Sequence, residues 1–152
     1  MIMEKIGHKK TPVSNGAFWI EGTISSSGKY QTMVSKTILD KSVDGKIWRS
    51  TNYGENWAHV QGEVNSENKV WNSVKMTSSG KYQVAIGDVD YIWYSEDYGE
   101  NWISTNTEDN RYFIAISSSG QYSTLCTRTS NVGKIYTGYS NLILDELYNY
   151  TD

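Results

Sequence analysis

The side chains that could carry acid–base or metal chemistry are scattered along the chain. His8 and His59 are its two histidines, and a metal site would need the fold to bring both together. Asp88 and Asp90 could touch one cation from a single loop, and Asp97 could act as a catalytic or metal-binding carboxylate. The sequence favours simpler interpretations: packed or solvated imidazoles, solvated loop charge, and a carboxylate that bonds to its own turn. We therefore expect neither a cofactor nor a metal.

Three repeated segments supply the elements that would position such side chains. Each has a Ser-rich turn with a glycine, followed by an aromatic residue and a strand-like run. The copies are Ile24–Thr32, Met76–Val84 and Ile116–Thr124. Their glycines, Gly28, Gly80 and Gly120, lie 52 and 40 residues apart, a period typical of propeller blades and other repeat arrays. Such a turn could cradle a phosphate, but without a Lys-Ser/Thr pair or a following helix it is better explained as a hairpin.

A second motif follows the first two of these segments. Its marked positions are Ser50, Asn52, Gly54, Asn56 and Trp57 in one copy, and Ser95, Asp97, Gly99, Asn101 and Trp102 in the other. In a tight hairpin the Asp or Asn side chain can accept backbone N–H bonds, and glycine can take a positive φ. Tryptophan can fold under the turn and bury a large apolar face. The third unit keeps the strand and loses the turn, as terminal repeats often do.

The two copies resemble the Asp box, the BNR or sialidase-type repeat of many β-propellers. In that family the box forms the hairpin between the third and fourth strands of a blade, so the resemblance implies a structural role for these residues. With the Ser-rich turns it covers about residues 17–140, and similar runs also resemble repeat proteins of large DNA viruses and phages. It implies a binding or structural module, such as a virion or adhesion component contacting protein or glycan. The alternative is a glycosidase-like enzyme with an unrecognised site.

Sialidases hold a substrate carboxylate with three arginines and use a Tyr–Glu pair as the nucleophile. This chain has only Arg49, Arg111 and Arg128, and no arginine precedes Arg49, where the first of the family's three would stand. We therefore expect no catalytic activity.

The expected fold is all-β, with three four-stranded antiparallel propeller-like blades; a β-trefoil, also built from three four-stranded units, is the alternative. The units follow a tail at 1–14 and span about 15–62, 68–106 and 110–150. Short aromatic and β-branched runs bounded by Ser, Gly, Asp and Asn mark the strands. In the middle unit these lie at about 71–76, 81–86, 91–95 and 102–105, and a last strand is expected at about 142–150.

Composition agrees with a turn-rich β protein of one domain. The 152 residues include 12 Tyr, 6 Trp and 13 Gly but a single Pro, and 38% are hydrophobic, which fits neither disorder nor a membrane span. The net charge of −3 argues against a nucleic-acid binder. The one cysteine, Cys126, excludes an intrachain disulfide and is expected to be a small buried residue. The first residues contain no apolar stretch of signal-peptide length, so we expect a cytoplasmic or virion location.

Three blades are fewer than the four to eight that usually close a propeller. The sequence therefore predicts a homo-oligomer, most simply a dimer closing a six-blade ring. Its contacts are expected where exposed strand edges meet, near Phe18–Ile24 and near 142–150. A chain that is part of a longer repeat protein would give the same count of blades.

Overall fold

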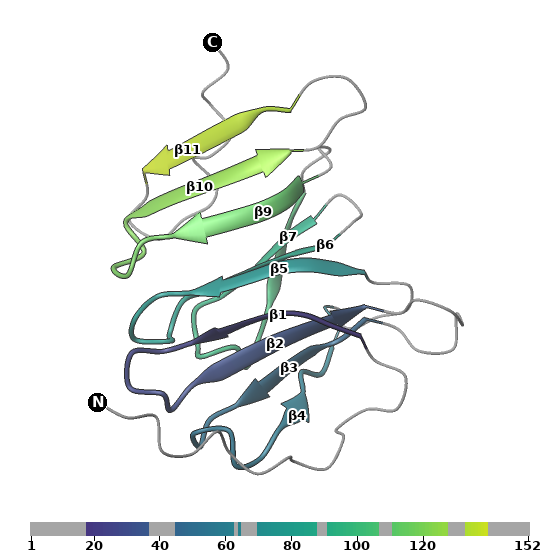
Figure 1. Ribbon diagram of the computed structural model, residues 1–152, viewed down its shortest axis with the longest axis vertical. Helices are drawn as coiled ribbons and strands as arrows, with labels where there is room; N and C mark the ends of the chain where they lie inside the picture. The colour runs from purple at the N-terminus through teal and green to yellow at the C-terminus, as the bar shows by residue number, and fades with distance from the viewer. Residues whose placement is uncertain are drawn as a thin grey trace, which may run out of the picture.

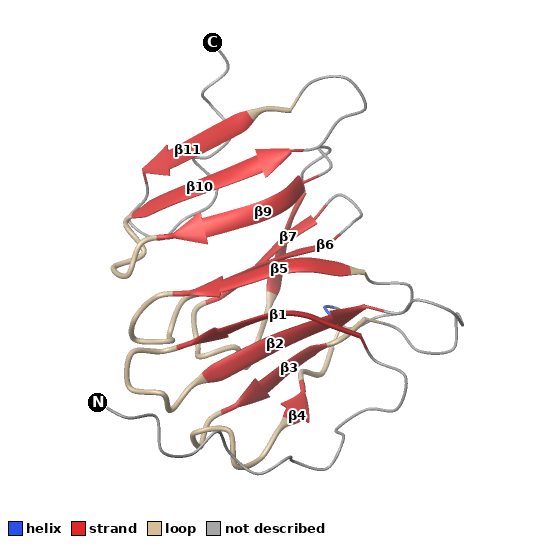
Figure 2. Ribbon diagram, viewed as in Figure 1, coloured by secondary structure: helices blue, strands red, loops and turns tan. Residues whose placement is uncertain are grey.

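Three antiparallel sheets make up the described part of the computed structural model, which comprises residues 18–36, 45–62, 64, 70–87, 91–106, 111–127 and 133–139. Blade 1 contains β1 (Phe18–Ile24), β2 (Gln31–Lys36), β3 (Ile47–Ser50) and β4 (Ala58–His59). Blade 2 contains β5 (Trp71–Met76), β6 (Gln83–Gly87), β7 (Tyr91–Ser95) and β8 (Ile103–Asn106). Blade 3 contains β9 (Arg111–Ile116), β10 (Tyr122–Thr127) and β11 (Ile135–Tyr139). Neighbours in each sheet follow the order of the chain (Figures 1 and 2), so each blade is a meander.

The expected all-β class and propeller-like blades are confirmed, and the strand bounds agree closely. β1, β5 and β7 have the expected bounds, whereas β6 begins two residues late because Lys81 and Tyr82 still belong to the turn. Similarly, β8 begins after Trp102, which belongs to the preceding turn. The tail at 1–14 and the strand expected at 142–150 lie outside the described residues, so blade 3 has three described strands.

The first strands of the blades lie side by side along the middle of the molecule. β5 contacts both β1 and β9. In Figure 1, blade 1 extends from this line toward the bottom of the view, blade 3 extends toward the top, and β6 and β7 lie behind β5. The blades thus fan out around their first strands, as in a propeller.

The core lies between the blades, because alternate residues of a strand point to opposite faces of its sheet. Along β6, Ala85 belongs to the apolar cluster shared with blade 1, whereas Val84 and Ile86 belong to the cluster shared with blade 3. The first cluster is rich in tryptophan and comprises Val34, Ile47, Val60, Val64, Trp71, Val74, Ala85 and Trp93. The second comprises Val84, Ile86, Ile92, Ile114 and Leu125.

The prediction that the array of blades ends in open strand edges needs correction. Neighbouring blades pack face to face through side chains, so the surface left at each end of the array is the face of a sheet. On blade 1 this outer face carries Trp19, and on blade 3 it carries Phe113 and Ile135, all three of them exposed. The edges of β1 and β9 instead lie beside the first strand of blade 2.

Candidate binding surface

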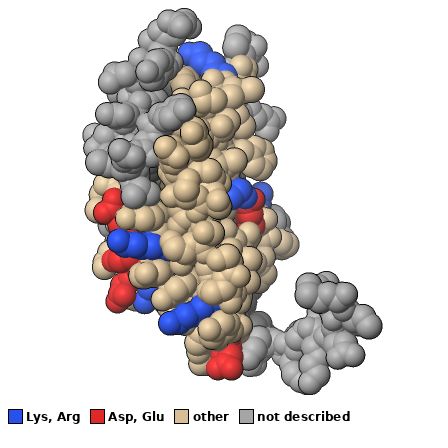
Figure 3. Space-filling view, turned by 90° about the vertical axis from the view of Figure 1, so that its left-hand side faces the viewer, with Lys and Arg blue, Asp and Glu red and all other residues tan. Residues whose placement is uncertain are grey.

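The two kinds of repeated turn lie together at one end of the blades, which we call the hairpin end. It comprises the first hairpins, at 25–30, 77–82 and 117–122, and the turns at 51–57 and 96–102. The Tyr53 N–H donates to the carbonyl of Lys29 at 3.1 Å, and the Tyr98 N–H donates to that of Lys81 at 3.0 Å. Each four-stranded blade thus ties its two hairpins together. Figure 3 faces this end and shows cationic and anionic side chains close to one another.

Asp97 organises the turn of blade 2. One carboxylate oxygen accepts the N–H groups of Glu100 at 3.1 Å and Asn101 at 2.9 Å. The same oxygen accepts the Ser95 hydroxyl at 2.8 Å, and the other oxygen accepts the Asn101 side-chain amide at 2.7 Å. The Ser95 hydroxyl oxygen in turn accepts the Gly99 N–H at 3.0 Å. The carboxylate is therefore used by its own turn, as expected from the sequence.

These bonds also determine the protonation state of Asp97. Partial burial by itself raises the pKa of the carboxyl, but the bonds from Asn101, Ser95 and Glu100 outweigh it and hold the pKa below its usual value. The group is thus ionised at neutral pH, and its charge is neutralised in part by N–H dipoles.

The turn of blade 1 has the same geometry with a neutral side chain at its centre. The Asn52 side-chain oxygen accepts the Asn56 N–H and the Ser50 hydroxyl, both at 3.0 Å. The Gly54 N–H donates to the Ser50 oxygen at 3.0 Å. Asn52 therefore takes the place of Asp97 without its charge, so a shared acid function is not built into the repeat.

The glycines and tryptophans also occupy the expected places. Gly54 and Gly99 have φ angles of 80° and 79°, which favour glycine. The indole N–H of Trp57 donates to the Gly54 carbonyl at 3.2 Å, and that of Trp102 donates to the Gly99 carbonyl at 3.1 Å. Both indoles are half-buried beside their turns, and Trp102 packs against the core between blades 1 and 2.

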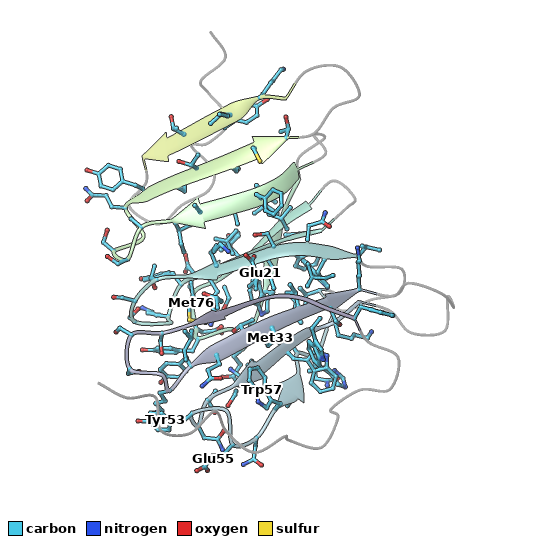
Figure 4. The ribbon with its side chains drawn as sticks, viewed as in Figure 1. Glu21, Met33, Tyr53, Glu55, Trp57 and Met76 are labelled. Carbon is cyan, nitrogen blue, oxygen red and sulfur yellow. The ribbon has the colours of Figure 1, made fainter. Side chains whose placement is uncertain are left out.

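Sequence reasoning missed the tyrosine that precedes each of these glycines. Tyr53 and Tyr98 have φ angles of 60° and 63°, an uncommon conformation for a residue with a side chain. The Tyr53 side chain is 64% exposed, and that of Tyr98 is 36% exposed. Figure 4 shows Tyr53 and Glu55 projecting from the hairpin end.

Sequence reasoning also missed Gln83, which joins the hairpins of one blade to the neighbouring blade. Its amide N–H donates to the Gly80 carbonyl at 3.0 Å, and its oxygen accepts the buried Thr32 hydroxyl of blade 1 at 2.6 Å. The first repeat has the same Tyr-Gln pair, with Gln31 in the place of Gln83, and this repetition is the feature of the sequence that points to the glutamine. The third repeat has Ser123 there.

A recess opens at the hairpin end between blades 2 and 3. Tyr82, Tyr94, Glu96 and Ser123 are among its lining residues. The corresponding place between blades 1 and 2 is filled by the Gln83 side chain and by the stack of Tyr30 on Tyr98, whose ring centroids lie 4.3 Å apart. The shorter Ser123 leaves this space open between blades 2 and 3.

The described residues show no cluster of arginine side chains. Arg49, on β3, lies 3.6 Å from the Glu100 carboxylate and 3.4 Å from the Tyr98 carbonyl, so it links blade 1 to the turn of blade 2. Arg111 begins β9, and Arg128 lies outside the described residues.

The remaining candidates for chemistry are not brought together either. The His59 ring packs edge-on against Trp48. Cys126 is half-buried, not fully buried as expected, because it lies on the outer face of blade 3. His8, Asp88 and Asp90 lie outside the described residues, and within the described ranges no three His, Cys, Asp or Glu side chains are grouped as metal ligands. That part of the chain also contains no helix of the length and apolarity needed to cross a membrane.

Solved structures with a similar fold are β-propeller proteins. YCF48 bound to D1 peptide matches with a TM-score of 0.62 and 16% identity over 81% of this chain and 38% of that chain. A nidogen/laminin complex matches with a TM-score of 0.64 and 12% identity over 82% and 45%. The GH74 enzyme of Niastella koreensis matches with a TM-score of 0.59 and 11% identity over 82% and 21%. No family model and no curated protein matches the sequence.

These likenesses establish the propeller fold. The chain spans less than half the length of each of these three solved chains. The resemblance to the Asp-box family and to viral repeat proteins stays a prediction.

Proposed function

We propose that this chain is a non-catalytic propeller module that binds a protein partner through its hairpin end. The observation that carries the proposal is the recess between blades 2 and 3, which half-buried Tyr82 and Tyr94 help to line. The same end of the blades also carries the exposed rings of Tyr53, Tyr98 and Tyr122. Tyrosine supplies a large and rigid contact surface with a polar tip, and neighbouring serines supply adaptable hydrogen bonds. This combination is typical of surfaces that recognise proteins.

Charges of both signs surround the tyrosines. The Lys29 and Lys81 ammonium groups lie 5.2 and 5.0 Å from the ring centroids of the following tyrosines. Exposed Glu55 and Glu96 lie on the two turns. A surface of mixed charge favours a polypeptide, which offers both signs, over a polyanion such as nucleic acid.

The recess is the part of this surface best shaped to hold a segment of the partner. Its tyrosines can pack on an apolar or aliphatic side chain, and the exposed Glu96 at its rim can pair with a lysine or an arginine. We therefore expect the bound segment to combine an apolar residue with a basic one.

Two of the structural neighbours support a protein partner. One is described as bound to a peptide, and the other belongs to a complex of nidogen and laminin. An adhesion or virion component would use such a module in the same way, by holding a second protein.

Selection of a phage-displayed random peptide library on the immobilised chain tests the proposal. We expect enriched peptides with an apolar and a basic residue, whose binding is lost in Tyr82→Ala and reduced in Glu96→Gln. Phe18→Ala and Glu55→Gln are the controls, because they remove an exposed aromatic ring and an exposed carboxylate away from the recess. If no peptide is enriched and the chain binds specifically to a glycan array, the proposal of a protein partner is wrong and the ligand is a glycan.

A further inference from the structure

The outer face of blade 1 carries the same residue types as the face of blade 2 that is buried against blade 1. Trp71 and Trp93 of blade 2 belong to the tryptophan-rich core, and Trp71 is 0% exposed. Their repeat counterparts, Trp19 and Trp48, contact each other edge-on on the outer face of blade 1, where Trp19 is 41% exposed. Met33, labelled in Figure 4, occupies the place of Ala85. Blade 1 thus presents a surface of the kind that a neighbouring blade covers.

The outer face of blade 3 resembles the face of blade 1 that packs against blade 2. On blade 1, Val34 and Ile47 are paired across β2 and β3, and both are fully buried against blade 2. On blade 3 the equivalent pair is Cys126 and Ile135, and Ile135 is 76% exposed. Phe113 pairs with Cys126 from the other side and is 59% exposed.

Polar groups on the two outer faces match in the same way. Between blades 1 and 2, the Thr32 hydroxyl donates to the Gln83 side chain. The counterpart of the donor is Thr124, which is exposed on the outer face of blade 3. The counterpart of the acceptor is Gln31, on the outer face of blade 1. The faces between blades 2 and 3 have no such pair, since Val84 and Ser123 stand there.

A backbone ladder runs across the first hairpins with a defined direction. The Ser26 N–H donates to the Ser78 carbonyl, and the Ser78 N–H donates to the Ser118 carbonyl, both at 2.8 Å. The ladder therefore ends in a donor, the Ser118 N–H on blade 3, and begins with an acceptor, the Ser26 carbonyl on blade 1.

The tyrosine stack gives a fourth match. Tyr30 of blade 1 stacks on Tyr98 of blade 2. By the repeat, the corresponding rings at the two ends of the array are Tyr122 on blade 3 and Tyr53 on blade 1, both of them exposed.

We propose that the outer face of blade 3 docks on the outer face of blade 1 in a second copy of this chain, repeating the interface between blades 1 and 2. Thr124 then bonds to Gln31 of the second copy, Ser118 to its Ser26, and Tyr122 stacks on its Tyr53. The side-chain volumes in the proposed contact also compensate each other. Cys126 is smaller than Val34, its counterpart between blades 1 and 2, whereas Met33 of the second copy is larger than its counterpart, Ala85. Two such contacts related by a two-fold axis close a ring of six blades, within the usual range of propellers. The contact includes the outermost hairpins but not the residues that line the recess between blades 2 and 3, so it does not rest on peptide binding in that recess.

Light scattering on charge-reversal variants tests the proposal. Wild type should be a dimer, whereas Ile135→Arg on blade 3 and Trp19→Glu on blade 1 should each be monomeric, because each homodimer would contain two damaged contacts. An equimolar mixture should form a heterodimer, since one contact is then wild type and the other pairs opposite charges. Ile103→Arg is the control, because Ile103 is similarly exposed but lies on β8, outside both outer faces.

The rate of thiol labelling at Cys126 is a second readout that does not depend on mass. Labelling should be slow in wild type and in the mixture, and fast in either variant alone, while circular dichroism confirms that each variant is folded. If a variant fails to fold, Thr124→Lys tests the same contact at an exposed position. A monomeric wild type, or two variants that remain dimeric, would overturn the proposal; so would a mixture without heterodimers.

Discussion

The Thr32 hydroxyl donates a 2.6 Å hydrogen bond to the side-chain oxygen of Gln83, and both residues are buried between blades 1 and 2. The same glutamine donates to the Gly80 carbonyl at 3.0 Å, so a single side chain connects two blades and a hairpin. Gly99 packs closely over it, because a Cβ there would lie 3.1 Å from the Gln83 amide. The turn of blade 2 thus covers the bond that joins it to blade 1.

Replacing Thr32 by valine keeps its shape and removes this donor. The Gln83 oxygen is then left buried without the hydroxyl, and we expect the free energy of unfolding to fall by about 1–3 kcal/mol. Urea unfolding followed by tryptophan fluorescence measures the change. Ser104→Ala, which removes an exposed hydroxyl on β8, is the control and should stay within about 0.5 kcal/mol of wild type. Equal stability of Thr32→Val and wild type would show that the bond is dispensable.

The pH dependence of stability should report Asp97. Because its pKa is lower in the folded chain than in the unfolded chain, the unfolded chain takes up the proton first as the pH falls. The stabilisation is therefore present above the unfolded pKa, near 4, and is lost as the pH falls through the folded pKa. Asp97→Asn should flatten the decline in unfolding free energy below about pH 4, and an unchanged slope would contradict this prediction.

In Asp97→Asn, part of the fall in unfolding free energy at low pH should remain because of Glu21. Partial burial raises the pKa of Glu21, but bonds from Lys75, Ser73 and the Val74 N–H lower it by more. Figure 4 shows Glu21 beside β5, where its carboxylate accepts the Ser73 hydroxyl at 2.7 Å and the Val74 N–H at 2.8 Å. It thus joins blade 1 to the first strand of blade 2.

Three glycine-to-alanine changes separate backbone strain from close packing. Gly133 has neither a positive φ nor an atom too close to an added Cβ, so Gly133→Ala should be nearly neutral. Gly62 has a φ of 96° with open space around it, so Gly62→Ala should be destabilised by strain alone. Gly99 has both constraints, and Gly99→Ala should lose more than about 1 kcal/mol and rank last in melting temperature. Any other order would contradict our account of this turn.

Sialidase activity should be absent. The Arg49 guanidinium already faces the Glu100 carboxylate and the Tyr98 carbonyl, and a substrate carboxylate would have to compete with both. A fluorogenic sialoside should therefore release no fluorophore above the blank. Release that disappears in Arg111→Ala would show that the sequence contains an active site that we did not recognise.

Local patterns in the sequence were enough to predict the strands and the paired turns. β1, β5 and β7 are alternating or aromatic runs bounded by Ser, Gly and Asp, and these patterns depend only on neighbouring residues. The bonding around Asp97 and Asn52 could likewise be predicted, because short polar side chains at such spacing bond within their own turn.

The relation between blades could not be predicted in the same way. Which face of a strand meets the next blade depends on how repeats stack in space, so the sequence alone predicts strand edges at the ends of the array. Gln83 looks like any polar residue at the start of a strand, and its role appears only when Thr32 is brought beside it. The half-buried state of Cys126 has the same cause, since its fully buried counterpart, Val34, has a blade to pack against.

The position of blade 2 between two others has a consequence for how the chain opens in thermal fluctuations. Among the described strands, the extensive contacts between blades join blade 2 to each of the other two, so local unfolding should begin at the ends of the array. In β6 four successive residues, from Gln83 to Ile86, are buried, and their amide protons should exchange with solvent only on global unfolding. In β10 burial alternates, so its amides should exchange sooner in a single copy of the chain. Docking of a second copy on blade 3 would then slow exchange in β10 much more than in β6, which hydrogen-exchange mass spectrometry at two protein concentrations can measure.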